Sequence, residues 1–161
     1  MSDRRKSPLD SESVEPHMCS PQMRLDILSQ VPFFKPLKQG EVAAINRLFR
    51  ERGYLPGETI YFAGDSAEHL YVLADGKVKL LRHNWTGKDV LLELLTPGEF
   101  FGSLSSLGDD AHAETAQAQT PVCVLTIQAE DFRSILDRHP AAALAVLDLV
   151  SERLRLSLIH I

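Results

Sequence analysis

The stretch from Pro97 to Ala118, PGEFFGSLSSLGDDAHAETAQA, decides the fold of this chain. It begins with a Pro-Gly turn, continues through the aromatic pair Phe100-Phe101 into Gly102, and then enters a loop of small residues. A glycine followed by small polar residues lets backbone N–H groups point at one spot, an arrangement that binds anions and phosphate above all. The same composition is typical of an ordinary loop between strands, so spacing alone leaves both interpretations open.

The residues before this stretch predict an all-β domain. Turn signals containing glycine recur at Pro56-Gly57, Asp75-Gly76 and Thr86-Gly87. Between them lie short runs rich in β-branched and aromatic residues, namely ETIYF, HLYVLA, KVKLLRH and DVLLELL. Strands at this spacing indicate a sandwich or barrel, and Asp-Gly is typical of a tight hairpin turn. After the stretch, VCVLTI predicts one more strand.

Helical patterns flank the strands. Ser20-Pro21 predicts a helix start, with Ser as N-cap and Pro at the first helical position. A second helix is expected to place Val42, Ile45, Leu48 and Phe49 on one face. Beyond the strands, we expect a short helix over 130–137 and a longer one that begins at Pro140.

The phrase PGEFFGSL, followed by ETA at Glu114, resembles the phosphate-binding cassette of the cyclic-nucleotide-binding domain. The likeness is to the version found in the Crp/Fnr family of bacterial transcription regulators, and it runs from about Leu25 to Arg155. It implies a mainly β fold with flanking helices. The core would be a double-stranded β-helix, a jelly-roll-like β-roll of the cyclic-nucleotide-binding type, followed by a C-terminal dimerisation helix.

The resemblance also divides the chain. It implies the β-roll with its N-terminal helices over 20–138 and the start of the dimerisation helix over 139–155. Residues 1–19 are polar and have little to bury, so their composition predicts a disordered tail. The final residues, 156–161, read LSLIHI, which matches the translation of a transposon end used in sequencing libraries. We therefore expect a non-native tail after Arg155. The helix-turn-helix domain that follows in the family is expected to be missing.

The cassette differs from the family at the two positions that contact a cyclic nucleotide. In the family, a Glu contacts the ribose hydroxyl where this chain has Ser103, and an Arg pairs with the cyclic phosphate where it has Glu114. A carboxylate there replaces a charge-assisted attraction with repulsion. The resemblance thus implies a retained pocket for an unknown small-molecule effector that does not use cyclic AMP in the usual way. The effector-pocket candidates are Gly98, Glu99, Phe101, Gly102, Ser103, Leu104, Ser105, Ser106, Glu114, Thr115 and Ala116.

The C-terminal helix carries an apolar stripe formed by Leu144, Leu147, Val150 and Leu154. Spacing alone fits either a helix packed on its own core or a coiled-coil seam. The resemblance favours the seam and implies a homodimer. A net charge of −5 gives no basic footprint for nucleic acid. DNA would be contacted only through the missing domain, and RNA polymerase only in the full-length protein.

Composition limits the number of domains, the cellular location and the cysteine chemistry that we expect. A chain of 161 residues fits one domain. It has no apolar run of membrane-spanning length and no secretory signal, so the cytoplasm is expected. Cys19 in the polar tail and Cys123 in an apolar strand predict no disulfide framework and no zinc site. We expect Cys123 to be a small buried residue.

The six histidines have no metal-ligand spacing, and no catalytic motif is present, so neither a metal site nor an enzyme is predicted. His83 as an axial haem ligand stays a minor alternative. The leading prediction is the effector-sensing and dimerisation domain of a Crp/Fnr-type regulator. The alternatives are a stand-alone module of the same fold that regulates a protein partner, and a β-roll metalloprotein.

Overall fold

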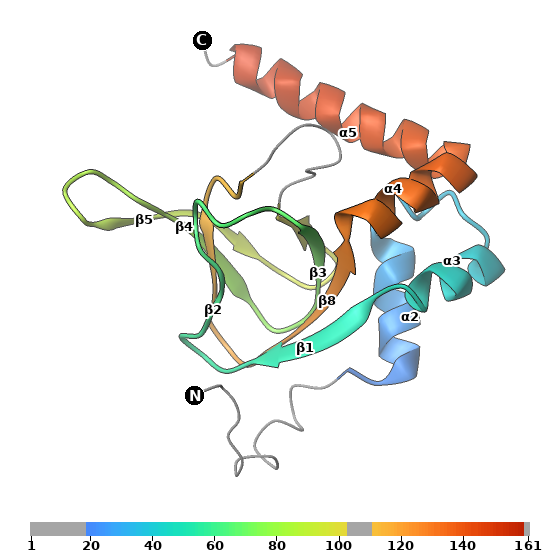
Figure 1. The fold of residues 1–161 in the computed structure, drawn as a ribbon, viewed down its shortest axis with the longest axis horizontal. Coiled ribbons are helices and arrows are strands. Elements are labelled where there is room, and N and C mark those ends of the chain that lie inside the picture. The colour runs from blue at the N-terminus through green and yellow to red at the C-terminus, as the bar shows by residue number, and fades with distance from the viewer. Residues whose placement is uncertain (1–18, 103–110, 160–161) are drawn as a thin grey trace.

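The computed structural model describes residues 19–102 and 111–159, with side chains as far as Glu152. Two four-stranded sheets with antiparallel pairings form a β-roll, with the helices gathered to one side (Figure 1). The first sheet has the order β1 (Arg50–Tyr54), β8 (Val122–Gln128), β3 (His69–Asp75), β6 (Phe100–Phe101). The second has the order β2 (Thr59–Tyr61), β7 (Thr115–Ala118), β4 (Val78–His83), β5 (Asp89–Leu95). The predicted mainly β fold is confirmed.

The helices of the described residues lie at both ends of the chain. They are α2 (Pro21–Gln30), α3 (Gln39–Asn46), α4 (Ala129–Arg138) and α5 (Pro140–Ile159). The predicted start of α2 is confirmed, because Ser20 Oγ accepts a hydrogen bond from the backbone N–H of Met23 at 3.1 Å. Within the described part of the chain, no helix has the length and apolar character needed to cross a bilayer.

The first sheet has buried apolar residues on both of its faces, so the protein has two cores. The inner core lies between the two sheets and includes Leu73 and Val124 from the first sheet and Val78 from the second. The outer core lies between the first sheet and the helices, where Phe33, Phe34 and other rings meet. Phe33 stacks edge-on against Phe34, Phe100 and Phe132, with ring centroids 4.9, 4.8 and 5.4 Å apart. These contacts join the roll to α4.

Two turns of the roll share one local design. Leu55-Pro56-Gly57-Glu58 and Thr96-Pro97-Gly98-Glu99 both place glycine at a positive φ, 89° and 97°. In both, the glutamate carboxylate accepts the N–H of the residue three positions earlier at 2.7 Å. Proline presets one central residue and glycine permits the other, so the tetrapeptide closes itself. The sequence Pro-Gly-Glu therefore specifies a turn wherever it stands in this roll.

The structure corrects the predicted extent of the second helix. It ends at Asn46, and the chain enters β1 at Arg50, a strand that the sequence analysis did not predict. Leu48, expected on the buried face of the helix, is 42% exposed. The segment RERGY begins with three charged residues in a row, so it lacks the apolar face that alternation would give a strand. It forms a strand because β8 offers it a complete antiparallel partner.

The cysteine prediction is wrong. Cys19 and Cys123 form a disulfide across 104 residues of sequence, with their Cα atoms 6.1 Å apart. Cys123 is fully buried, as expected, but it is not free. Cys19 is only 8% exposed and belongs to the outer core, although we had assigned it to a polar tail. Residues 1–18 of that predicted tail lie outside the described residues.

Candidate functional site

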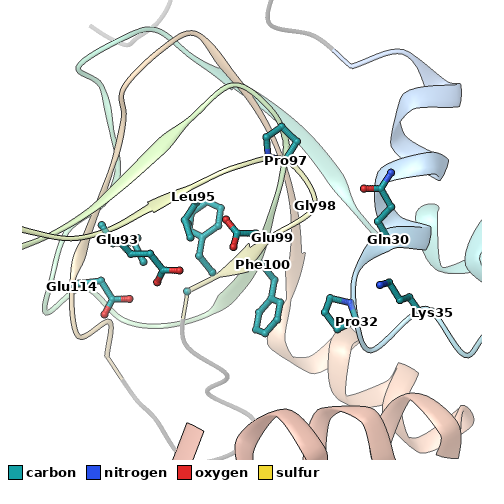
Figure 2. A pocket seen from close by; sticks show the side chains of 13 residues that line it. Gln30, Pro32, Lys35, Glu93, Leu95, Pro97, Gly98, Glu99, Phe100 and Glu114 are labelled. Carbon is teal, nitrogen blue, oxygen red and sulfur yellow. The ribbon is translucent and has the colours of Figure 1, made fainter. Parts of the chain in front are cut away.

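A pocket of about 580 Å³ opens between the second sheet and the turn that follows α2 (Figure 2). Its lining comes from distant parts of the chain. The lining residues are Gln30, Pro32, Lys35, Leu80, Glu93, Leu95, Pro97, Gly98, Glu99, Phe100, Phe101, Gly102 and Glu114. Hydrogen bonds from the N–H of Leu73 to the carbonyl of Glu99 and from Gly98 to Leu73 hold the Pro97–Glu99 turn against β3. Pro97 to Gly102 of the predicted cassette therefore line one wall of this pocket.

Two glycines shape that wall. Gly102 has φ of 94°, and a Cβ atom there would lie 2.9 Å from Tyr71 Cδ1 and 3.3 Å from the carbonyl oxygen of His69. At Gly98, a Cβ atom would lie 3.3 Å from Gln30 Oε1. Glycine at these positions lets the backbone lie close to β3 and to the end of α2.

Glu99 has a structural task in addition to lining the pocket. Its Oε1 accepts hydrogen bonds from the N–H of Thr96 at 2.7 Å and from the Thr96 hydroxyl at 3.4 Å. The equivalent Glu58 closes its own turn in the same way, away from the pocket. One carboxylate oxygen of Glu99 is therefore occupied by hydrogen bonds within the turn.

The charge of the pocket is predominantly negative. Glu93 of β5 and Glu114, which directly precedes β7, point toward the same region of the pocket (Figure 2). Glu99 lies between these two carboxylates and α2. Lys35 stands on the opposite side, near Gln30. Three carboxylates and one ammonium line the space, so a phosphate placed beside Glu114 and Glu93 would meet two like charges.

Beneath this acidic region lies a buried aromatic pair. The ring of His112 stacks on Tyr61 with centroids 3.6 Å apart, and both residues are almost fully buried. Burial raises the pKa of Tyr61 above its usual range, and the Glu114 carboxylate raises it further. Burial lowers the pKa of His112, against the opposite influence of Asp65. Both side chains are therefore neutral at pH 7.

The Tyr61 hydroxyl and His112 Nδ1 are buried and have no hydrogen-bond partner among the described residues. A buried polar group without a partner costs free energy. Neither of these two residues lines the pocket.

The structure brings together five of the predicted site residues, which are Gly98, Glu99, Phe101, Gly102 and Glu114. Thr115 and Ala116 do not line the pocket. The Thr115 hydroxyl accepts the N–H of Ala63 at 2.9 Å, and Ala116 is fully buried in the inner core. Ser103, Leu104, Ser105 and Ser106 lie outside the described residues.

Sequence reasoning missed the walls contributed by α2, β4 and β5. Gln30, Pro32 and Lys35 come from the end of α2 and the turn after it, and Glu93 comes from β5. A signal existed for Glu93, which is the one charged residue inside the apolar run VLLELL. No comparable signal marked Gln30 or Lys35, because polar residues are common on helix surfaces and in the turns between elements.

The side chains that could bind haem or a metal ion lie outside the pocket. His83 sits at the exposed end of β4, where its imidazole contacts the Asp89 carboxylate, outside the pocket. Within the described residues, Cys19, Glu51 and Cys123 form a group whose ligand atoms lie within 4.8 Å of one another. Both sulfur atoms of that group are joined in the disulfide.

Comparison with known proteins gives the class to which this fold and pocket belong. Residues 51–139 match the family described as the cyclic nucleotide-binding domain, and the chain belongs to that family. Its homologues include regulators of the Crp type. It is 35% identical over 124 residues to the "Cyclic AMP receptor protein" of Thermus thermophilus, an alignment that covers 77% of this chain and 57% of that protein.

Solved structures agree. The "Catabolite Activator Protein" of Thermus thermophilus superposes with a TM-score of 0.75 at 33% identity, covering 80% of this chain and 61% of that one. The N-terminal domain of a transcriptional regulator from Streptomyces coelicolor gives a TM-score of 0.70 at 32% identity, covering 82% of this chain and 92% of that one. The chain thus spans about 57% of the length of the curated relative and nearly all of an isolated N-terminal domain.

Proposed function

We propose that this chain is the effector-sensing and dimerisation part of a Crp/Fnr-type DNA-binding regulator whose pocket does not hold cyclic AMP in its usual pose. The observation that supports this function is Glu114, which lines the pocket together with Glu93 where the family pairs an Arg with the cyclic phosphate. The role is regulatory and not catalytic. The effector is a small molecule whose groups beside these carboxylates are neutral or cationic.

A route from the pocket to the C-terminal helices runs through aromatic rings. Phe100 lines the pocket and contacts Phe33, which contacts Phe132 of α4. An effector that displaces Phe100 therefore changes the packing under α4 and α5. Such a ligand acts by binding one packing arrangement better than the other, and it shifts the population by that difference in affinity.

The exposed stripe on α5 supports the proposed homodimer. Leu144, Leu147 and Val150 are 63%, 59% and 40% exposed, although each is apolar. A second copy of α5 would cover them, while the side chain of Leu154 lies outside the described residues. In the full-length protein, the paired helices would orient two DNA-binding domains and present the regulator to RNA polymerase in the cytoplasm.

Calorimetry with cyclic AMP and cyclic GMP tests the effector proposal. We expect the chain to show no saturable micromolar binding. Glu114→Arg restores attraction for phosphate and should raise the affinity at least about tenfold, the equivalent of about 1.4 kcal/mol. Asp137→Arg makes the same charge change on an exposed position of α4 and should leave binding unchanged. Micromolar binding of either nucleotide by the unmodified chain would refute the proposal.

A further inference from the structure

The cysteine pair joins the start of α2 to the middle of the first sheet. Cys19 directly precedes the N-cap Ser20, and Cys123 lies in β8, which has β1 on one side and β3 on the other. Cys123 is fully buried, and Cys19 is 8% exposed. The disulfide is the one covalent link between the described N-terminal segment and the β-roll other than the chain itself.

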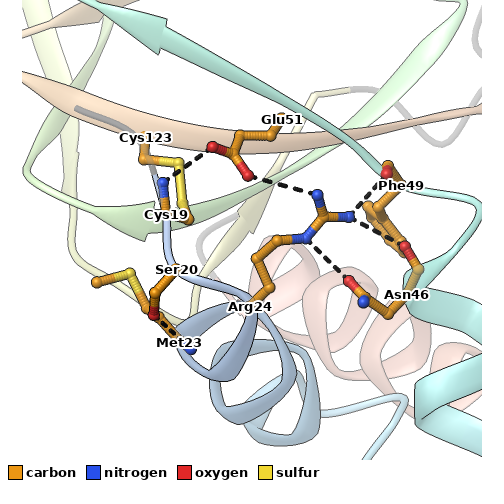
Figure 3. Close-up of polar contacts among 8 residues, drawn as sticks. All are labelled: Cys19, Ser20, Met23, Arg24, Asn46, Phe49, Glu51 and Cys123. Carbon is orange, nitrogen blue, oxygen red and sulfur yellow. Dashed lines mark hydrogen bonds and ion pairs between the residues drawn. A yellow bond between two sulfur atoms is a disulfide. The ribbon is translucent and has the colours of Figure 1, made fainter. Parts of the chain in front are cut away.

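A polar network stands directly beside the disulfide (Figure 3). Glu51 of β1 accepts the backbone N–H of Cys19 at 3.0 Å and pairs with Arg24 of α2 at 3.4 Å. Arg24 in turn donates to the carbonyl oxygens of Asn46 and Phe49 at 3.0 and 2.8 Å, and to Asn46 Oδ1 at 2.9 Å. The polar contacts that join the first turn of α2 to the β-roll therefore converge on Cys19, Arg24 and Glu51.

We propose that Cys19–Cys123 is a reversible redox site that fixes the first turn of α2 to the β-roll when oxidised and releases it when reduced. The co-reactant is a dithiol. One thiolate of the dithiol attacks Sγ of Cys19, the less buried sulfur; the S–S bond breaks, and Sγ of Cys123 leaves as a thiolate that takes a proton. The second thiol of the dithiol then attacks the mixed disulfide and frees Cys19 as a thiol. Two electrons and two protons pass to the protein, and the dithiol becomes a disulfide.

The location of the disulfide at the start of α2 determines which part of the protein reduction loosens first. The noncovalent bonds at this end of α2 are few and directional, whereas Ile27 and Leu28 at the other end are buried in the outer core. Reduction should therefore loosen residues 19–24 while the rest of the helix stays packed. Gln30, at the far end of the same helix, lines the effector pocket and lies against Gly98. Any effect of reduction on effector affinity rests on the proposed function, whereas the redox step itself does not.

The test uses the whole chain with dithiothreitol as the dithiol. EDTA is present because the reduced cysteines and Glu51 offer three ligand atoms close together. Free thiols are counted by alkylation and mass spectrometry after denaturation, and amide exchange is followed over 19–30 in both states. We expect no free thiol before reduction, two after reduction of the folded protein, and at least tenfold faster exchange over 19–24. Exchange in β3 should stay unchanged, and reoxidation should restore the original pattern.

The double variant Cys19→Ser/Cys123→Ser should reproduce the reduced pattern and ignore dithiothreitol. If it does not fold, reduction of the unmodified chain still decides the question. Several results would overturn the proposal. They are free thiols that persist under oxidising conditions, a disulfide that resists dithiothreitol while the protein is folded, identical exchange in both states, and unfolding of the whole chain on reduction. None of these depends on which effector the pocket binds.

Discussion

The first turn of α2 and the segment after its last turn are attached to the β-roll by different forces. At the first turn the attachments are directional bonds, namely the disulfide, the hydrogen bond from the Cys19 N–H to Glu51, and the Arg24–Glu51 pair. After the last turn, the attachments are buried apolar side chains, which are Val31, Phe33 and Phe34. Directional bonds can be lost one at a time, whereas apolar burial is lost only when the core opens. One end of α2 is therefore suited to regulation and the other to stability.

The largest predicted effect is at the apolar end. Phe33→Ala removes a fully buried ring that contacts Phe34, Phe100 and Phe132, and it leaves a cavity between the roll and α4. We expect the free energy of unfolding to fall by about 3–5 kcal/mol, measured by urea unfolding of the oxidised protein.

The matched control is Phe62→Ala, because the Phe62 side chain is 56% exposed. It should change the free energy of unfolding by less than about 0.5 kcal/mol. A loss at Phe33 as small as that at Phe62 would mean that the apolar end does not carry the stability of this region, and the comparison between the two ends would fail.

An intermediate effect is predicted for the polar network. Arg24→Leu removes the ion pair with Glu51 and leaves the carbonyl oxygens of Asn46 and Phe49 without their charged donor. The Arg24 and Glu51 side chains are only 18% and 13% exposed, so water replaces these bonds poorly. We expect a loss of about 2 kcal/mol in the free energy of unfolding.

A double-mutant cycle separates the ion pair from the other bonds of Arg24. Glu51→Gln keeps an oxygen for the Cys19 N–H but removes the charge, so the double variant with Arg24→Leu should lose less than the sum of the two single changes. Arg133→Leu, on an exposed position of α4, is the matched control and should be nearly neutral. Strict additivity would show that Arg24 and Glu51 do not act as a pair.

The same contrast explains what the sequence could predict. The turns and most strands follow from periodicity and from glycine and proline positions, which are local properties. The start of α2 was also predictable, because Ser20-Pro21 is a local cap signal. In the pocket, the resemblance identified five residues that the structure places in one lining, namely Gly98, Glu99, Phe101, Gly102 and Glu114.

What the sequence could not show depends on distant segments. The Cys19–Cys123 bond requires the register of β8 and the path of the chain before α2, 104 residues apart. Strand β1 forms because β8 pairs with it, not because RERGY has a strand pattern. Lys35 and Gln30 enter the pocket because of where α2 ends in space. The predicted residues Ser103 to Ser106 lie outside the described part of the chain, and their role stays a prediction.

The smallest predicted effect concerns the helix cap, and it tests how the bonds of the first turn depend on one another. Ser20→Ala removes the acceptor for the Met23 N–H and should cost about 1 kcal/mol in the oxidised protein, measured by urea unfolding. Ser29→Ala is the control, because Ser29 Oγ donates to the Leu25 carbonyl on an exposed face and alanine favours the helix.

The informative comparison is the cost of Ser20→Ala after reduction of the disulfide. A cap stabilises the protein only in molecules whose first helical turn is formed. If reduction releases that turn, the cap is already unused in part of the population, and its removal should cost less than in the oxidised protein. An equal cost in the two states would mean that the disulfide and the cap act independently, and that the first turn of α2 stays in place without its covalent link.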